Sequence, residues 1–167
     1  KFLENFCKKN NITLIFDEII TGIRSDRNSV QKKYNIKPDI TTIGKIIGGG
    51  MPIGVIGISK NVYRNIEKKK IFYGGTFSGN SLSSFVGNET LKYLMKNKKI
   101  IQKINAKSKY FQDNLNRYIY LNKMNLKIYR YSSILRIVYT KNKINNRTQR
   151  DFFENKISKK IGNFKKF

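Results

Sequence analysis

The spacing of apolar residues changes several times along the chain, and each spacing predicts a different element. Short apolar runs rich in Ile alternate with segments in which apolar residues recur with a helical period. Short β-rich runs predict strands, whereas a period of about 3.6 residues predicts helices. The alternation of the two predicts an α/β fold, in which parallel strands are covered by helices on both faces.

The expected elements follow from these patterns. Helices are expected at residues 1–9, 61–69, 81–95, 100–118 and 149–160, and strands at residues 12–16, 40–43, 53–59, 126–131 and 134–139. The run 12–16 is apolar on both faces and predicts a buried strand. Residues 21–37 are polar and are expected to be irregular, with one helical turn, and residues 72–80 to form a Gly-rich loop. The change from strand–helix alternation to helix–strand–strand–helix predicts two lobes that meet near residue 97.

Composition narrows the class of protein. The 167 residues are 39% hydrophobic, which is enough for an ordinary globular core. No apolar run approaches the roughly 18 residues of a membrane span, so no membrane association is expected. The single cysteine, Cys7, fits a reducing compartment, and we expect a cytoplasmic location. The absence of His excludes the usual histidine base and most zinc sites, so we predict no metal centre.

The net charge of +25 raises the question of a nucleic-acid partner. The basic residues are mostly Lys and are spread along the chain, and Asn and Ile are similarly abundant. We therefore interpret the charge mainly as the base composition of the gene, and expect no nucleic-acid partner. A basic nucleic-acid-binding module remains the alternative, because Tyr and Lys are interleaved over residues 118–139 as in stacking platforms.

Four features carry candidate chemistry, and each has a plain structural explanation when taken alone. Asp17 and Glu18 end the first strand, where they can act as loop carboxylates or helix caps. Lys45 follows the second strand and is one of many lysines. Residues 48–50 are three glycines, which fit a tight turn. In the loop 75–80, Thr76 or Ser78 can cap the helix that follows.

Taken together, these features fit pyridoxal-phosphate chemistry. That cofactor needs a lysine to hold it and a carboxylate to pair with its pyridinium nitrogen. The lysine must lie among strand ends, partly desolvated, for its amine to be nucleophilic. Hydroxyl and backbone N–H groups at the start of a helix suit a phosphate.

Three segments then resemble class III pyridoxal-phosphate-dependent aminotransferases. Residues 15–24 resemble the strand-end signature of that family, residues 38–54 its lysine motif, and residues 75–80 its phosphate loop. Within the family the nearest resemblance is to the glutamate-1-semialdehyde 2,1-aminomutases. Ser81 departs from the pattern, since the family usually has Pro there. The resemblance implies pyridoxal 5'-phosphate as cofactor and a fold-type I large domain followed by part of a small α+β domain.

The resemblance also implies roles for individual residues. Asp17 would bond the pyridine nitrogen, and Ile19 would pack on one face of the ring. Lys45 would form the Schiff base with the cofactor and then move the proton. Thr76 would bind the phosphate of the neighbouring subunit's cofactor, which implies a homodimer with shared active sites.

The resemblance covers less than half of a family member, so a fragment is expected. Residues 1–97 would be the carboxyl-terminal portion of the cofactor-binding large domain, and residues 98–167 part of the small domain. The expected reaction is transamination or intramolecular amino transfer on a small amino, keto or semialdehyde substrate. Because the upstream residues of the family are missing, we expect weak cofactor binding by this chain alone. An inactive remnant that only dimerises is a further alternative.

Overall fold

The computed structural model describes residues 1–25, 29–72 and 74–164. The chain divides into two compact units, Lys1–Lys103 and Ile104–Phe167. This division falls six residues beyond the boundary expected after residue 97 (103 − 97 = 6). Assigning the two units to a large and a small domain remains a prediction.

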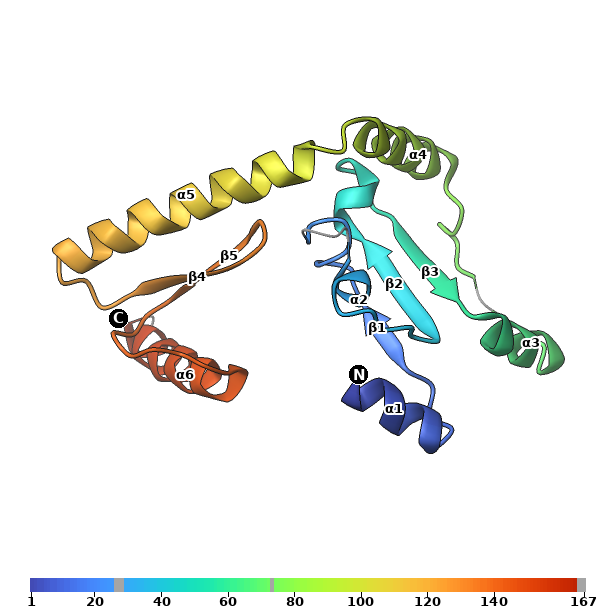
Figure 1. Ribbon diagram of the computed structural model, residues 1–167, viewed down its shortest axis with the longest axis horizontal. Helices are drawn as coiled ribbons and strands as arrows, with labels where there is room; N and C mark the ends of the chain where they lie inside the picture. Colours follow the sequence, from blue (N-terminus) through green and yellow to red (C-terminus); the bar gives the residue numbers. More distant parts are fainter. Residues whose placement is uncertain (26–28, 73, 165–167) are drawn as a thin grey trace. The chain divides into compact units, whose positions relative to one another are not determined.

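A three-stranded sheet organises the first unit. It consists of β1 (Ile15–Asp17), β2 (Ile40–Gly44) and β3 (Gly54–Ile58), with β2 in the middle (Figure 1). β2 pairs in parallel with β1 and antiparallel with β3. Because β1 and β2 run in the same direction, their carboxyl ends lie at one edge of the sheet. Asp17 ends β1 at this edge, Ile19 lies two residues later, and Lys45 directly follows β2.

The described residues of the first unit form five complete helices, and three of them start at a residue whose side chain caps the helix. The helices described are α1 (Phe2–Lys9), α2 (Val30–Lys33), the 3₁₀ helix η1 (Lys45–Gly48), α3 (Lys60–Lys68) and α4 (Ser81–Lys96). The side chains of Ser29, Ser59 and Asn80 cap α2, α3 and α4, each accepting a backbone N–H of the first turn. Since Asn80 caps α4, the interpretation of Thr76 or Ser78 as its cap is wrong.

Two glycines allow η1 and α4 to approach closely. Gly49 ends η1 with φ +57°, and a Cβ atom there would lie 2.3 Å from Thr90 Oγ1 of α4. On α4, a Cβ atom at Gly87 would lie 3.3 Å from the carbonyl oxygen of Ile47. The triple-glycine segment is therefore a packing contact as well as a turn, and it fixes the backbone immediately after Lys45.

The second unit contains a β-hairpin and two helices. α5 (Ile100–Leu121) begins in the first unit and continues into the second, followed by β4 (Lys127–Tyr131), β5 (Ile134–Val138) and α6 (Arg147–Phe164). The strands pair antiparallel, and Ser132 adopts φ +52° in the turn. Ile119, Ile128 and Val138 form the buried core of this unit. The Asn116 side chain of α5 binds both the N–H and the carbonyl oxygen of Ile128, each at 2.9 Å.

The types of the expected elements are confirmed, but the expected burial is wrong in places. The strand predicted at 12–16 begins only at Ile15, and the Ile15 side chain is 57% exposed. All five residues of β3 are exposed as well. An apolar run predicts a strand that other layers cover on both faces. The described elements are too few to cover both faces of this sheet, so its apolar strands are partly exposed.

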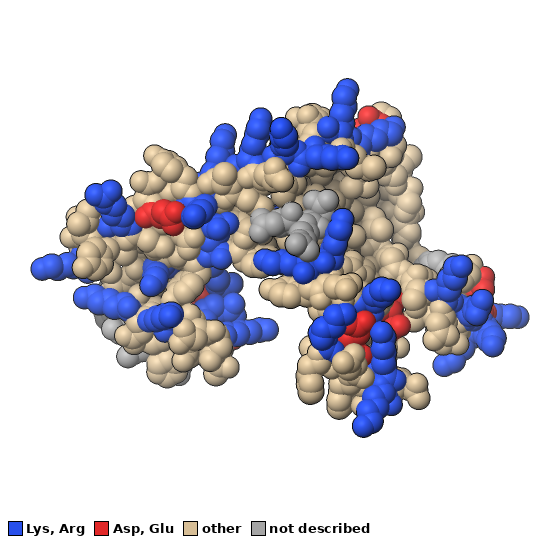
Figure 2. Space-filling view, viewed as in Figure 1, with Lys and Arg blue, Asp and Glu red and all other residues tan. Residues whose placement is uncertain are grey.

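Basic side chains are distributed over the surface. Figure 2 shows Lys and Arg on every part of the visible face, with few acidic residues between them. The charge is therefore not confined to one stripe on that face, which agrees with our interpretation of the composition.

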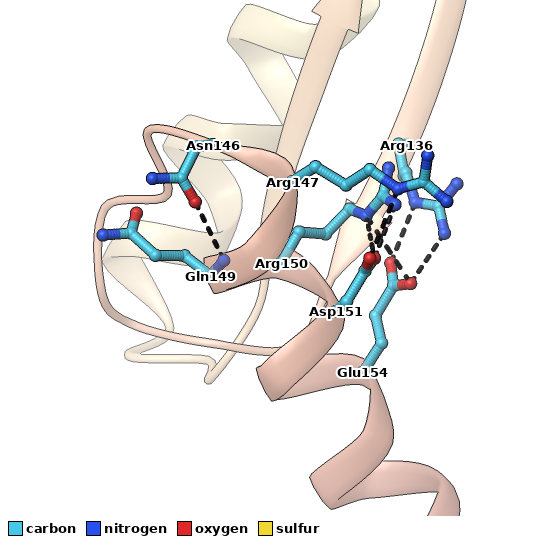
Figure 3. A network of polar contacts seen from close by, with 7 residues as sticks. All are labelled: Arg136, Asn146, Arg147, Gln149, Arg150, Asp151 and Glu154. Carbon is cyan, nitrogen blue, oxygen red and sulfur yellow. Dashed lines mark hydrogen bonds and ion pairs between the residues drawn. The ribbon is translucent and has the colours of Figure 1, made fainter.

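A network of ion pairs joins β5 to the first turns of α6 (Figure 3). Arg136 makes a bidentate pair with Glu154, with Nε–Oε1 and Nη2–Oε2 distances of 2.8 and 2.7 Å. Arg150 and Arg147 both donate to Asp151. The Arg136 guanidinium lowers the pKa of Glu154, and the hydrogen bond from Arg150 lowers the pKa of Asp151. Both carboxylates are thereby held in their charged form.

Candidate cofactor site at the end of the parallel strands

Asp17 is the last residue of β1, and its carboxylate is fixed through one oxygen. Asp17 Oδ1 accepts the backbone N–H of Ile19 and the hydroxyl of Thr42, both at 3.0 Å. The side chain is exposed. Among the described residues, none donates to the other oxygen, Oδ2. Asp17 is thus an oriented carboxylate with one oxygen available to an outside partner.

Glu18, the next residue, has a different environment. It is 1% exposed, and its carboxylate accepts the Thr21 hydroxyl and the backbone N–H groups of Val30 and Gln31 at 2.8–3.0 Å. These backbone groups belong to the first turn of α2, where unpaired N–H groups favour a carboxylate. Of the two adjacent carboxylates, Glu18 therefore stabilises the loop and Asp17 faces outward.

Lys45 lies just beyond the end of β2 and has an unusual backbone conformation. Its φ is +48°, in the left-handed region that costs a residue with a side chain about 1 kcal/mol. The side chain is exposed, and no described residue pairs with its ammonium group. The partial desolvation expected of a cofactor lysine is therefore not met by the described residues of this chain. Backbone strain of this kind is typical of functional sites, and here it directs Lys45 out of the strand path.

Strand pairing brings Asp17 and Lys45 to the same edge of the sheet. Asp17 is the register partner of Thr42, and β2 ends two residues later at Gly44. A strand advances about 3.3 Å per residue, so Lys45 leaves the sheet roughly 7–10 Å beyond the level of Asp17. This offset along the strand is comparable to the length of a pyridine ring that carries an aldehyde opposite its nitrogen.

Ile19 lies against the backbone that precedes Lys45. A Cβ atom at Gly44 would be 3.4 Å from Ile19 Cγ2 and 3.2 Å from the carbonyl oxygen of Ile53. The glycine thus leaves room for the Ile19 side chain beside the lysine. A carboxylate, an amine and an aliphatic side chain are together at one edge, and this set of groups fits pyridoxal phosphate.

Thr76 is not brought to this edge by any described contact. It lies exposed in a turn where the Ser78 N–H bonds the carbonyl oxygen of Gly75 at 2.8 Å. Phe72 and Phe77, which flank Thr76, are 87% and 83% exposed. The structure therefore groups three of the four predicted site residues and leaves the phosphate loop apart.

Thr42 contacts the candidate site, and we did not predict it from the sequence. Its hydroxyl donates to Asp17, although the two residues are 25 positions apart. Its contact with Asp17 follows from the parallel register of β1 and β2, and the apolar pattern of the sequence does not specify that register.

Comparison with known proteins identifies the family of the chain. The family model for class III aminotransferases matches residues 1–153. The chain belongs to the class III aminotransferase family. Membership supports pyridoxal phosphate as the cofactor, and none of the comparisons supports the alternative of a nucleic-acid-binding module.

The relatives of this class III chain include several glutamate-1-semialdehyde 2,1-aminomutases. The protein of that name from Thermosipho melanesiensis is 35% identical over 166 residues, which cover 98% of this chain and 37% of the relative. The one from Wigglesworthia glossinidia brevipalpis is 40% identical over 139 residues, covering 83% of this chain and 32% of the relative. The chain thus spans about a third of the length of these relatives.

The fold of the chain resembles that of solved transaminase structures. An omega-transaminase from Sphaerobacter thermophilus matches with a TM-score of 0.73 and 25% identity, over 85% of this chain and 33% of the transaminase. An ornithine aminotransferase from Plasmodium yoelii matches with a TM-score of 0.69 and 27% identity, over 83% and 36% of the two chains. The expected fold-type I architecture is thereby confirmed for part of the fold. Within residues 1–25, 29–72 and 74–164, no helix has the length and apolarity needed to cross a bilayer.

Proposed function

We propose that this chain supplies the lysine and the carboxylate of a pyridoxal-phosphate site for amino transfer. The substrate is a small amine with a keto or semialdehyde partner, and the reaction is transamination or intramolecular amino transfer. The observation that carries the proposal is the placement of Asp17 and Lys45 at the shared carboxyl edge of β1 and β2, with Asp17 Oδ2 left available. One aminomutase is 35% identical to this chain over 98% of its length, and this similarity favours the intramolecular reaction.

Each residue has a defined task in this proposal. Pyridoxal phosphate, when bound, withdraws electrons from the substrate carbon that loses a proton. Asp17 holds positive charge on the pyridine nitrogen through Oδ2, while Oδ1 stays bound to Ile19 and Thr42. The Lys45 amine holds the cofactor and then carries the proton at Nζ. Ile19 packs on the ring and excludes water from one face.

Thr76 enters the proposal as a phosphate ligand in a homodimer. The exposure of Phe72 and Phe77 in the same loop supports the homodimer part of this proposal, since large aromatic side chains at a loop are typical of a surface that a partner covers. Each Thr76 would then serve the cofactor of the other subunit. We place the reaction in the cytoplasm, in line with the free thiol of Cys7.

A chimera tests the proposal. This chain would replace the segment that it matches in the Thermosipho melanesiensis aminomutase, so that the remaining residues come from a complete relative. We expect the purified chimera to bind pyridoxal phosphate with a visible absorbance band and to convert glutamate-1-semialdehyde. Lys45→Ala should abolish both signals, whereas Lys60→Ala, at the exposed start of α3, should preserve them. A folded chimera whose absorbance band survives Lys45→Ala would contradict the proposal.

A further inference from the structure

We propose that Thr42 is a positioning residue, which orients the Asp17 carboxylate toward the cofactor. The inference rests on the proposed function and adds a residue to it. It starts from the hydrogen bond between Thr42 Oγ1 and Asp17 Oδ1, at 3.0 Å, across the parallel pair of strands.

The two donors to Asp17 come from different segments of the chain. The Ile19 N–H lies two residues later on the same segment, and the Thr42 hydroxyl comes from the neighbouring strand. Both donate to Oδ1, so rotation of the carboxylate would break one bond or the other. The effect is that Oδ2, and not Oδ1, is presented to a pyridine nitrogen.

Thr42 is itself held firmly. Its carbonyl oxygen accepts the N–H of Glu18 at 2.9 Å, so its backbone and side chain both bind the end of β1. Glu18 is anchored in turn on the first turn of α2. The strand end that carries Asp17 is thereby tied to β2 immediately before the lysine, which couples the position of the carboxylate to that of Lys45.

The neighbouring Thr41 provides a matched control. Its hydroxyl donates to Gln31 Oε1 at 3.2 Å, away from Asp17, because side chains alternate between the faces of a strand. Thr41→Val and Thr42→Val are the same chemical change at adjacent positions of β2. Only the second removes a donor to Asp17. Thr42→Ser keeps the hydroxyl and serves as the conservative rescue.

Reductive trapping on the 167-residue chain tests the inference. The chain would be incubated with increasing pyridoxal phosphate and reduced with borohydride, and peptide mass spectrometry would give the labelling of Lys45 relative to the other lysines. We expect Thr42→Val to lower the preference for Lys45 about three- to tenfold, the net effect of one ordinary hydrogen bond, because this bond is exposed to water. Thr42→Ser and Thr41→Val should retain the preference.

Asp17→Ala separates the possible results. If Asp17→Ala leaves the labelling of Lys45 unchanged, the proposed function is wrong and the role of Thr42 falls with it. If Asp17→Ala lowers the labelling but Thr42→Val does not, only the inference about Thr42 is overturned. In the Asp17→Ala background, a further Thr42→Val change should have no effect. An additional loss in that background, or a loss shared by Thr41→Val, would show that Thr42 acts only through general stability and would contradict positioning.

Discussion

Asp17 and Glu18 are adjacent in the sequence, yet one carboxylate is exposed and the other is almost completely buried. Glu18 binds the start of α2 with its side chain, whereas Asp17 turns toward the carboxyl edge of the sheet. The pair thus divides into a residue that stabilises the loop and a residue that is available for chemistry.

Removing the buried carboxylate should destabilise the first unit. Glu18→Ala leaves the N–H groups of Val30 and Gln31 without their acceptor, and we expect a loss of about 3 kcal/mol in the free energy of unfolding. Urea unfolding followed by circular dichroism measures the loss. Asp17→Ala is the control and should cost less than about 1 kcal/mol, because its hydrogen bonds are exposed to water. Equal losses for the two variants would contradict the division of roles.

A methyl group at Gly49 should separate η1 from α4. Gly49→Ala combines a left-handed backbone with a Cβ atom 2.3 Å from Thr90 Oγ1, and we expect a loss of roughly 2–4 kcal/mol. Gly54→Ala on β3 meets no atom within 4 Å and should stay within about 0.5 kcal/mol of the parent. Thermal unfolding of the two variants compares them directly. A Gly49→Ala protein as stable as Gly54→Ala would show that this contact is absent.

Acid should weaken the contacts of α1 through Glu4. Hydrogen bonds from Lys8 and Lys1, of which the one from Lys8 has the larger effect, lower the pKa of Glu4 from its usual 4.5 to about 2. Because the folded pKa lies below the unfolded one, this stabilisation is complete above pH 4.5 and is lost as the pH falls toward 2. Unfolding midpoints from pH 6 to pH 2 should therefore decline less steeply in Glu4→Gln than in the parent. Glu89→Gln, which removes a half-exposed carboxylate on α4, should keep the parental slope.

The ion pair between β5 and α6 should contribute modestly to stability. A double-mutant cycle with Arg136→Ala and Glu154→Ala should give a coupling energy of about 0.5–1 kcal/mol, since the pair is bidentate but partly exposed. The coupling should fall at 1 M salt, where screening is stronger. The single-contact pair of Lys92 with Glu89 is the comparison and should couple by less than about 0.5 kcal/mol. A larger coupling for Lys92 with Glu89 would contradict this order.

Local signals in the sequence account for most of the elements. The helical period over α4 and the β-rich runs at β2, β4 and β5 predict elements within a few residues of those observed. Helix starts also carry local signals, as Ser29 and Asn80 show. The exposure of Ile15 was not predictable in this way, because burial depends on which layers cover a strand and not on the strand itself.

The sequence by itself determined the element types, the family resemblance and the candidate residues Asp17, Ile19, Lys45 and Thr76, because these depend on neighbouring residues in the chain. Only the tertiary structure decided that Glu18 is buried while Asp17 is available, and that Thr42 donates to Asp17. The physical reason is strand register: the pairing of residues 17 and 42 joins segments that are distant in the sequence, and no local pattern specifies it.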